Sequence, residues 1–204
     1  TVDLIDQGVR DVEADDAVRV LHALAHDGAQ AAPLAVTQVN TLVAGYDVSE
    51  QAERLSEKHA RAYERLQGQI IALPGATKLL ETLSQENLKW CIATSGGVDT
   101  ATINLKALGL EADKIDIITR DEVHYGKPDP DLFLAAAKHM NVPIDECLVI
   151  GDAIWDMLAA RRCKATGIGV LSGGYDIGEL ERAGALRVYE DALDLLDHLD
   201  EIAS

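Results

Sequence analysis

The sequence predicts an α/β protein with a Rossmann-like core, a parallel sheet that carries helices on both faces, together with a separate all-helical unit. Two observations support this prediction. From about residue 9 to 67, apolar side chains recur at helical spacing, whereas in the rest of the chain short apolar runs alternate with amphipathic stretches. The change of rhythm falls at residues 68–74, so we expect an all-helical domain over residues 1–70 and an α/β domain over residues 71–204.

The expectation of an all-helical domain rests on two segments, VRVLHALAHDG and AERLSEKHARAYERL. Both place apolar residues at i, i+3, i+4 and i+7 with charged residues between them, which is the pattern of an amphipathic helix. Short breaks at residues 28–33 and 45–47 divide this region, and Ser49 followed by Glu50 has the features of a helix start.

Five short runs in the second domain have the length and composition of β-strands. Continuous rather than alternating hydrophobicity in CLVI and GIGVL predicts strands that are buried on both faces, which is typical of a parallel sheet under helices. The strand candidates are KWCIAT (89–94), KIDIIT (114–119), ECLVIG (146–151), ATGIGVL (165–171) and RVYE (187–190). The helices expected around them are GATKLLETLSQE, VDTATINLKALG, DPDLFLAAAKHM, AIWDMLAARRC, IGELERAG and a closing helix within residues 190–201.

The charge of the chain indicates which partners to exclude. There are 18 Lys and Arg against 35 Asp and Glu, a formal net charge of −17, and no run of basic residues. Such a surface repels the phosphates of nucleic acids and anionic membranes, and no segment reaches the ~18 consecutive apolar residues of a membrane span. We therefore expect neither a nucleic-acid nor a membrane partner, and the sequence leaves the oligomeric state open.

Cysteine usage and the first residues indicate the compartment. Cys91, Cys147 and Cys163 are an odd number without CxxC spacing, and the first two lie in apolar runs, so we expect reduced core thiols. The start of the chain has no basic region followed by an apolar stretch, which favours a cytoplasmic, unexported protein. Because the chain begins at Thr1 rather than Met, we expect that the natural N-terminus is missing.

The first motif with chemical potential is Thr94-Ser95-Gly96-Gly97, between an expected strand and an expected helix. In an open parallel sheet the ligand site lies at the carboxyl ends of the strands. Hydroxyls and backbone N–H groups at a helix N-terminus can hold the oxygens of a phosphate. Taken alone, this motif is equally typical of an ordinary strand-to-helix turn.

The second motif is the segment YGKPDPD, residues 125–131, before an amphipathic helix. Its two prolines fix the direction of the chain, and Lys127 stands before this rigid corner, where it can project a cation into a site. The alternative is a proline turn with a solvated lysine, in which Asp129 or Asp131 caps the helix.

The third motif, VIGDAIWD at residues 149–156, closes a buried strand with one carboxylate and adds a second at i+4. Asp152 lies at the strand tip, and Asp156 lies one helical turn further on the same side. Two such carboxylates suit Mg²⁺, which takes one or two protein carboxylates and fills its other positions with water and substrate phosphate. The alternative is that Asp152 only caps the following helix.

Together the three motifs form one coherent phosphate and metal site. Residues 94–95, 127–128 and 151–156 resemble motifs two, three and four of the haloacid-dehalogenase-like superfamily, in the subgroup with an α-helical cap that includes phosphoglycolate phosphatase and beta-phosphoglucomutase. The resemblance covers residues 73–204, including LPGA, GKPDPDLF, GDAIWDMLAA and SGGY, whereas residues 9–67 are similar to the cap in length and pattern only.

The resemblance implies a role for each of these residues. The phosphate-binding residues would be Thr94, Ser95, Gly96 and Lys127. Thr94 and Lys127 would also be catalytic, because they hold and neutralise the transferring phosphoryl group. Asp152 would bind Mg²⁺, and Asp156 would help directly, through water or through Lys127. In this family a carboxylate attacks the phosphoryl group to form an aspartyl-phosphate, which water then hydrolyses.

The nucleophile that this resemblance requires is unknown. The family's first motif is an apolar strand ending in Asp-x-Asp-Gly-Thr, and the nearest match, VDLIDQG at residues 2–8, has its aspartates three apart rather than two. Residues i and i+3 of a strand face opposite ways, so this match fails geometrically. Either roughly 15 to 20 preceding residues are absent from the chain, or the motif is lost. We favour the first, because the missing strand would be central to the sheet.

The sequence therefore predicts a magnesium-dependent phosphatase whose cap closes over a small phosphorylated metabolite. Three alternatives stay open. A sugar phosphomutase shares every core motif, and a haloacid dehalogenase uses the same nucleophile without Mg²⁺, which the carboxylate pair argues against. A non-catalytic phosphate-binding relative is favoured by the absent nucleophile.

Overall fold

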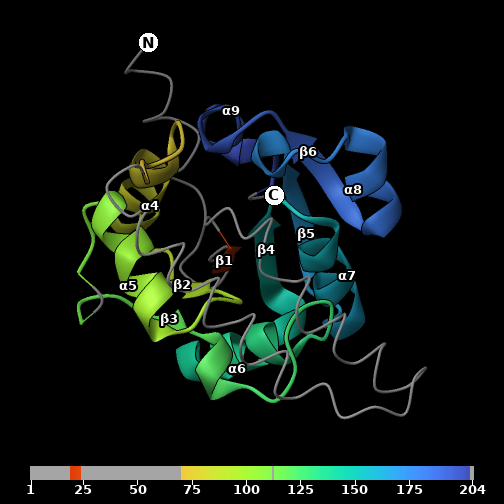
Figure 1. The fold of residues 1–204 in the computed structure, drawn as a ribbon. Helices are drawn as coiled ribbons and strands as arrows, with labels where there is room; N and C mark the ends of the chain where they lie inside the picture. The colour runs from red at the N-terminus through yellow and green to blue at the C-terminus, as the bar shows by residue number, and fades with distance from the viewer. Residues whose placement is uncertain (1–18, 24–69, 112, 203–204) are drawn as a thin grey trace.

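The centre of the molecule is a six-stranded parallel sheet with strand order β3-β2-β1-β4-β5-β6 (Figure 1). This computed structural model describes residues 19–23, 70–111 and 113–202, of which residues 19–23 are described by their backbone only. The strands are β1 (Arg19–Ala23), β2 (Trp90–Ala93), β3 (Ile117–Ile118), β4 (Cys147–Gly151), β5 (Thr166–Val170) and β6 (Ala185–Tyr189). The five strands predicted in the second domain are confirmed, with β3 shorter than expected and β6 beginning two residues earlier.

The predicted helices are also present, each within two or three residues of its expected segment. They are α4 (Ala76–Gln85), α5 (Val98–Ala107), α6 (Asp131–Met140), α7 (Ile154–Cys163), α8 (Ile177–Ala183) and α9 (Ala192–Asp197). Four 3-10 turns complete the described chain: η2 (Arg120–Glu122), η3 (Ile144–Glu146), η4 (Leu171–Gly173) and η5 (Leu199–Glu201). In this part of the chain no helix is long and apolar enough to cross a membrane.

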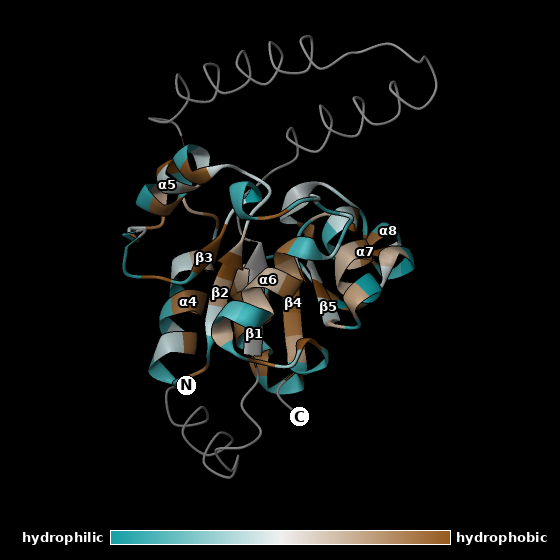
Figure 2. Ribbon diagram, turned by 90° about the horizontal axis from the view of Figure 1, so that it is seen from below, coloured by the Kyte–Doolittle hydropathy of each residue, from teal (hydrophilic) through white to brown (hydrophobic). Residues whose placement is uncertain are grey.

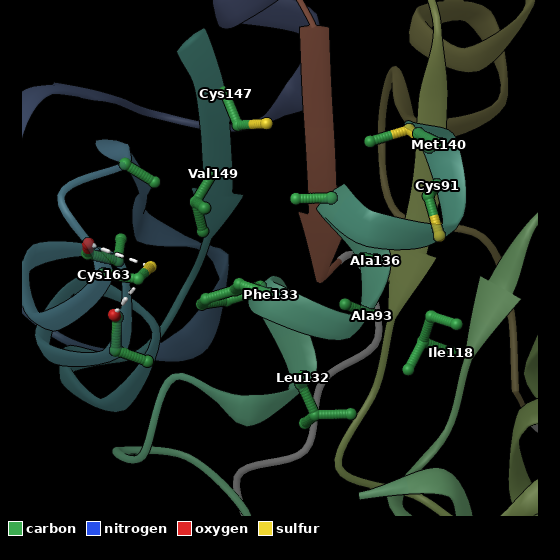
Figure 3. Close-up of a cluster of buried hydrophobic side chains, with 14 of the residues drawn as sticks. Cys91, Ala93, Ile118, Leu132, Phe133, Ala136, Met140, Cys147, Val149 and Cys163 are labelled. Atoms are coloured by element: carbon green, nitrogen blue, oxygen red, sulfur yellow. Dashed lines mark hydrogen bonds between the residues drawn. The ribbon is translucent and has the colours of Figure 1, made fainter. Parts of the chain in front are cut away.

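The apolar strands are covered by helices on both faces, as their continuous hydrophobicity predicts. Neighbouring residues of β4 show this arrangement, because side chains alternate across a strand. Val149 packs in one buried cluster with Phe133 of α6, whereas Ile150 packs in a second cluster with Leu79 of α4. Figure 3 shows the first cluster between the strands and α6, and Figure 2 shows the hydrophobic strands between the helical layers.

The cysteines lie in this core. Cys91, Cys147 and Cys163 are buried and form no disulfide, as expected. Burial of the Cys91 thiol raises its pKa to about 12, because the charged thiolate would lose its hydration. Cys163 donates to the backbone carbonyls of Ala159 and Ala160, both at 3.3 Å, within its own helix. These thiols therefore behave as small core residues.

One prediction in the N-terminal region is wrong. The segment VRVLHALAHDG was expected to be helical, but Arg19–Ala23 within it forms β1. This strand is central, since it pairs in parallel with β2 through His22 and Ile92 and with β4 through Ala23 and Gly151. Five residues with apolar side chains at Val20, Leu21 and Ala23 satisfy a helical or a strand pattern equally, and pairing on both edges decides for the strand. The rest of the expected all-helical domain, to residue 69, lies outside the described residues.

The position of β1 also shows that the expectation of a missing central strand is wrong. The slot between β2 and β4 is filled by Arg19–Ala23, so the sheet has no gap there. The strand order reverses at β1, which has β2 on one side and β4 on the other. In open α/β sheets the ligand site lies outside the carboxyl ends of the strands at this reversal.

Candidate functional site

The candidate residues lie at this carboxyl edge. Thr94 follows β2 directly, and Asp152 follows β4, the two strands that flank β1. Thr94, Asp152 and Asp156 are 4%, 7% and 3% exposed, and the Lys127 side chain is 6% exposed. Buried polar side chains are costly unless they are paired, so four of them at one edge mark a built polar site rather than a solvated loop.

Lys127 joins three elements at this edge. Its ammonium lies 2.8 Å from Oδ1 of Asp156 at the start of α7 and 3.4 Å from the carbonyl oxygen of Ala93 at the end of β2. The same nitrogen lies 5.6 Å from the centre of the Phe133 ring on α6, which suits a cation–π contact. The sequence alternative of a solvated lysine is therefore wrong.

The loop that carries Lys127 is fixed from outside. The 127–128 peptide bond is cis, and the carbonyl of Pro128 accepts a 2.8 Å hydrogen bond from Arg162 of α7. Asp131 accepts a hydrogen bond from the backbone N–H of Tyr125 at 3.1 Å, and α6 has no side-chain cap. The capping role considered for Asp129 or Asp131 is therefore not found, and these contacts hold the corner instead.

Asp156 has both oxygens engaged. Oδ1 accepts from Lys127, and Oδ2 accepts from the backbone N–H of Ala153 at 3.2 Å. A Cβ at Gly151 would lie 2.5 Å from the Asp156 Cβ, so only glycine allows the carboxylate to fold back against the strand end. Asp156 thus accepts from the backbone N–H of the N-cap residue of α7.

Asp152 is held by a contact that the sequence did not reveal. A Cβ added to Gly173 of η4 would lie 2.1 Å from the backbone carbonyl oxygen of Asp152, closer than any real contact. Glycine at this position lets the turn after β5 pack directly on the Asp152 backbone. Gly173 belongs to the SGGY segment that resembles the family, but the sequence alone does not show that the Asp152 backbone packs against it.

The turn after β2, residues 94–97, is organised around Thr94. Its hydroxyl accepts a 3.1 Å hydrogen bond from the backbone N–H of Gly96, and the backbone N–H of Thr94 donates to the carbonyl of Ile118 at 2.9 Å. The N–H of Val98, the first residue of α5, donates to Oδ2 of Asp121 at 3.0 Å. Asp121 is a second residue that sequence reasoning missed.

The oxygen ligands here fit a hard divalent cation. Asp152 and Asp156 supply two carboxylates at the edge where a phosphate would approach, which is the donor set that Mg²⁺ uses alongside water and phosphate. Lys127 and the backbone N–H of Ala153 engage the two oxygens of Asp156. Within the described residues no group of three or more His, Cys, Asp or Glu side chains gathers as a complete metal cage.

Comparison with known sequences assigns the chain to a family. The profile of the haloacid dehalogenase-like hydrolases matches residues 8–164 of the chain. Since this match covers more than half of the chain, and the α/β fold with its carboxyl-edge site agrees with it, the chain belongs to the haloacid dehalogenase-like hydrolase family.

The individual relatives include a hydrolase of known structure and two phosphatases. A hydrolase from Pseudomonas syringae, known from its crystal structure, is 62% identical, with a TM-score of 0.84 over 92% of this chain and 100% of that one. Hexitol phosphatase A of Escherichia coli is 36% identical over 58% of this chain and 54% of that protein. Phosphoglycolate phosphatase of Rhodospirillum rubrum is 32% identical over 62% and 52%. The chain therefore spans about half the length of these two curated relatives.

The position of β1 shows where the family's first motif should be sought. The residues after this strand read Leu24-Ala25-His26-Asp27-Gly28-Ala29. Residues 25–29 match the third and fourth positions of Asp-x-Asp-Gly-Thr, with alanine at the first and fifth. Sequence reasoning missed this match because the segment was assigned to a helix. These residues lie outside the described part of the chain, so only their sequence can be compared.

Proposed function

We propose that the chain is a Mg²⁺-dependent phosphohydrolase acting on a small phosphomonoester, with its phosphate site at the carboxyl edge of the sheet. The observation that carries the proposal is the buried contact of Lys127 and Asp156 beside Thr94 and Asp152, at the reversal of the strand order. Family membership and the phosphatase activities named for its relatives support the same reaction class.

Each residue contributes through charge or hydrogen bonding. The Lys127 ammonium, held by Asp156 and the Ala93 carbonyl, is buried, and a buried cation stabilises negative phosphoryl oxygens more strongly than it would in solvent. The Thr94 hydroxyl donates to a phosphoryl oxygen, with Ser95 and Gly96 forming the turn around it. Bound Mg²⁺ would neutralise further charge on those oxygens, with Asp152 as its principal ligand.

Phosphate release from a panel of phosphomonoesters, with and without Mg²⁺, tests this proposal. We expect Mg²⁺-dependent release that Asp152→Ala reduces by at least about a hundredfold. The exposed Asp145 provides a control, because Asp145→Ala removes the same charge away from the site. If the folded protein releases no phosphate from any ester, or if Asp152→Ala is as active as Asp145→Ala, the proposal is wrong.

A second candidate function is phosphate binding without a covalent step. It is favoured by β1, which fills the central strand position while the sequence after it has Ala25 where the family's motif has its first aspartate. This function predicts that the protein binds phosphate and Mg²⁺ without turnover, and that Ala25→Asp introduces phosphate release with a hydroxylamine-sensitive phosphoenzyme. Turnover by the unaltered protein would reject this candidate.

A further inference from the structure

The turn η2 contacts both loops of the proposed phosphate site, although none of its residues belongs to the three motifs at residues 94–97, 125–131 and 149–156. It begins one residue after β3, following Thr119, at the carboxyl edge of the sheet. We call residues 94–97 the Thr94 turn and residues 123–127 the Lys127 loop. The backbone N–H of Arg120 donates to the carbonyl of Gly96 at 3.1 Å, which joins η2 to the Thr94 turn.

The side chain of Arg120 holds the Lys127 loop. Its guanidinium donates to the carbonyl of Val123 at 2.6 Å and to the carbonyl of His124 at 3.2 Å. Its Cδ and Nε lie 3.6 Å from the position that a Cβ on Gly126 would occupy, so the stem lies along the loop just before Lys127. A planar fork with two donors directed at successive carbonyls fixes a loop's path more strictly than a single bond does.

The Asp121 side chain contacts the C-terminal end of the Thr94 turn. Its Oδ2 accepts from the N–H of Val98 at 3.0 Å, and that oxygen lies 3.0 Å from the position of a Cβ on Gly97. The carboxylate therefore satisfies the first turn of α5 and uses the space that glycine leaves. As a negative charge beside the proposed phosphate site, it can only repel the anion electrostatically, so a favourable role must come from geometry.

We propose that Arg120 and Asp121 are positioning residues of the phosphate site. Asp121 fixes the Thr94 turn and Arg120 fixes the Lys127 loop, so one short turn sets the distance between the hydroxyl side and the lysine side of the site. This inference rests on the proposed function, because it requires that a phosphate bind between these two loops. It assigns neither residue a contact with substrate.

Calorimetric titration with inorganic phosphate in the presence of Mg²⁺ tests the role of Asp121 without requiring turnover. We expect Asp121→Ala to weaken phosphate binding by about tenfold, because the turn loses its fixed geometry. Asp121→Asn keeps an oxygen acceptor and should bind within about twofold of the unaltered protein. A residue acting only through its charge would give the opposite result, since both variants would then bind phosphate more tightly.

The same titration tests Arg120. We expect Arg120→Met to weaken phosphate binding by about tenfold. Arg182→Met, at an exposed position on α8, removes the same charge from this acidic protein and should bind like the unaltered protein. If Arg120→Met fails to fold by circular dichroism, Arg120→Lys replaces it, because lysine keeps the charge and lacks the planar fork.

The outcomes separate the two proposals. If the unaltered protein binds no phosphate, the proposed function fails and this inference fails with it. If it binds phosphate but Asp121→Ala binds as tightly, or Arg120 variants match Arg182→Met, the inference alone is overturned. Weakening by Asp121→Ala, restoration by Asp121→Asn and weakening at Arg120 together support it.

Discussion

Removing one partner of the Lys127–Asp156 pair should destabilise the whole domain. The charged atoms are 2.8 Å apart and the side chains are 6% and 4% exposed. At an effective dielectric constant of about 20, two unit charges at this distance attract by about 6 kcal/mol before desolvation is counted. Breaking a buried pair usually costs about 3–5 kcal/mol, because the remaining charge stays buried. We therefore expect Lys127→Met and Asp156→Asn each to lower the free energy of unfolding by about that amount.

A double-mutant cycle measures the coupling between these two side chains. In the double variant no buried charge is left uncompensated, so its cost should resemble that of one single variant rather than the sum, giving a coupling of roughly 3 kcal/mol. Urea unfolding followed by the fluorescence of Trp90 and Trp155 supplies the four free energies. Single variants that each cost under about 1 kcal/mol, or costs that simply add, would refute the assignment of a buried ion pair, since those are the values of an exposed pair.

Three further predictions concern other described residues. Gly173→Ala should cost about 1–3 kcal/mol, because its Cβ would meet the Asp152 carbonyl at 2.1 Å. Gly174→Ala, with φ +81 but open space, should cost only about 1 kcal/mol; equal urea midpoints would contradict the close approach. The pKa of Cys91 is raised to about 12, so peptide mass spectrometry should show no reaction with iodoacetamide at pH 8 until urea unfolds the protein. The neutral thiol's contribution to the free energy of unfolding is present below pH 9.0. It should be lost as the pH rises toward 12, because only the unfolded thiol ionises in that range. His198, whose pKa is raised by a hydrogen bond to a backbone carbonyl four residues earlier, should show an NMR midpoint above 6.5, and a midpoint at or below 6.5 would reject that bond.

Much of the site could be located from sequence because its residues follow strands that are recognisable by themselves. Runs such as CLVI are apolar at every position, which predicts burial on both faces and hence a parallel sheet. Once the strands are placed, the residues after them must share one edge. Thr94, Asp152 and Asp156 were placed in this way, and the structure brings Lys127 into contact with Asp156 at that edge.

Several of the missed contacts join residues that are far apart in sequence. Asp121 accepts from the backbone N–H of Val98, and the backbone N–H of Arg120 donates to the carbonyl of Gly96. The Arg120 guanidinium instead binds carbonyls three and four residues later, in a segment without a recognisable motif. Gly173 is required only because the Asp152 backbone passes within contact distance of it. Patterns of hydrophobicity carry no information about such approaches, since these depend on how the loops after different strands meet.

The sequence by itself determined the α/β class, the second-domain strands and helices, and the polar residues at the strand ends. Local periodicity and turn chemistry encode these features in neighbouring residues. Only the tertiary structure decided that Arg19–Ala23 is the central strand, because a five-residue segment has no strong preference until β2 and β4 offer it hydrogen bonds on both edges. The tertiary structure likewise decided that Lys127 is a buried partner of Asp156 rather than a solvated cation, since that pairing joins residues 29 apart in the chain.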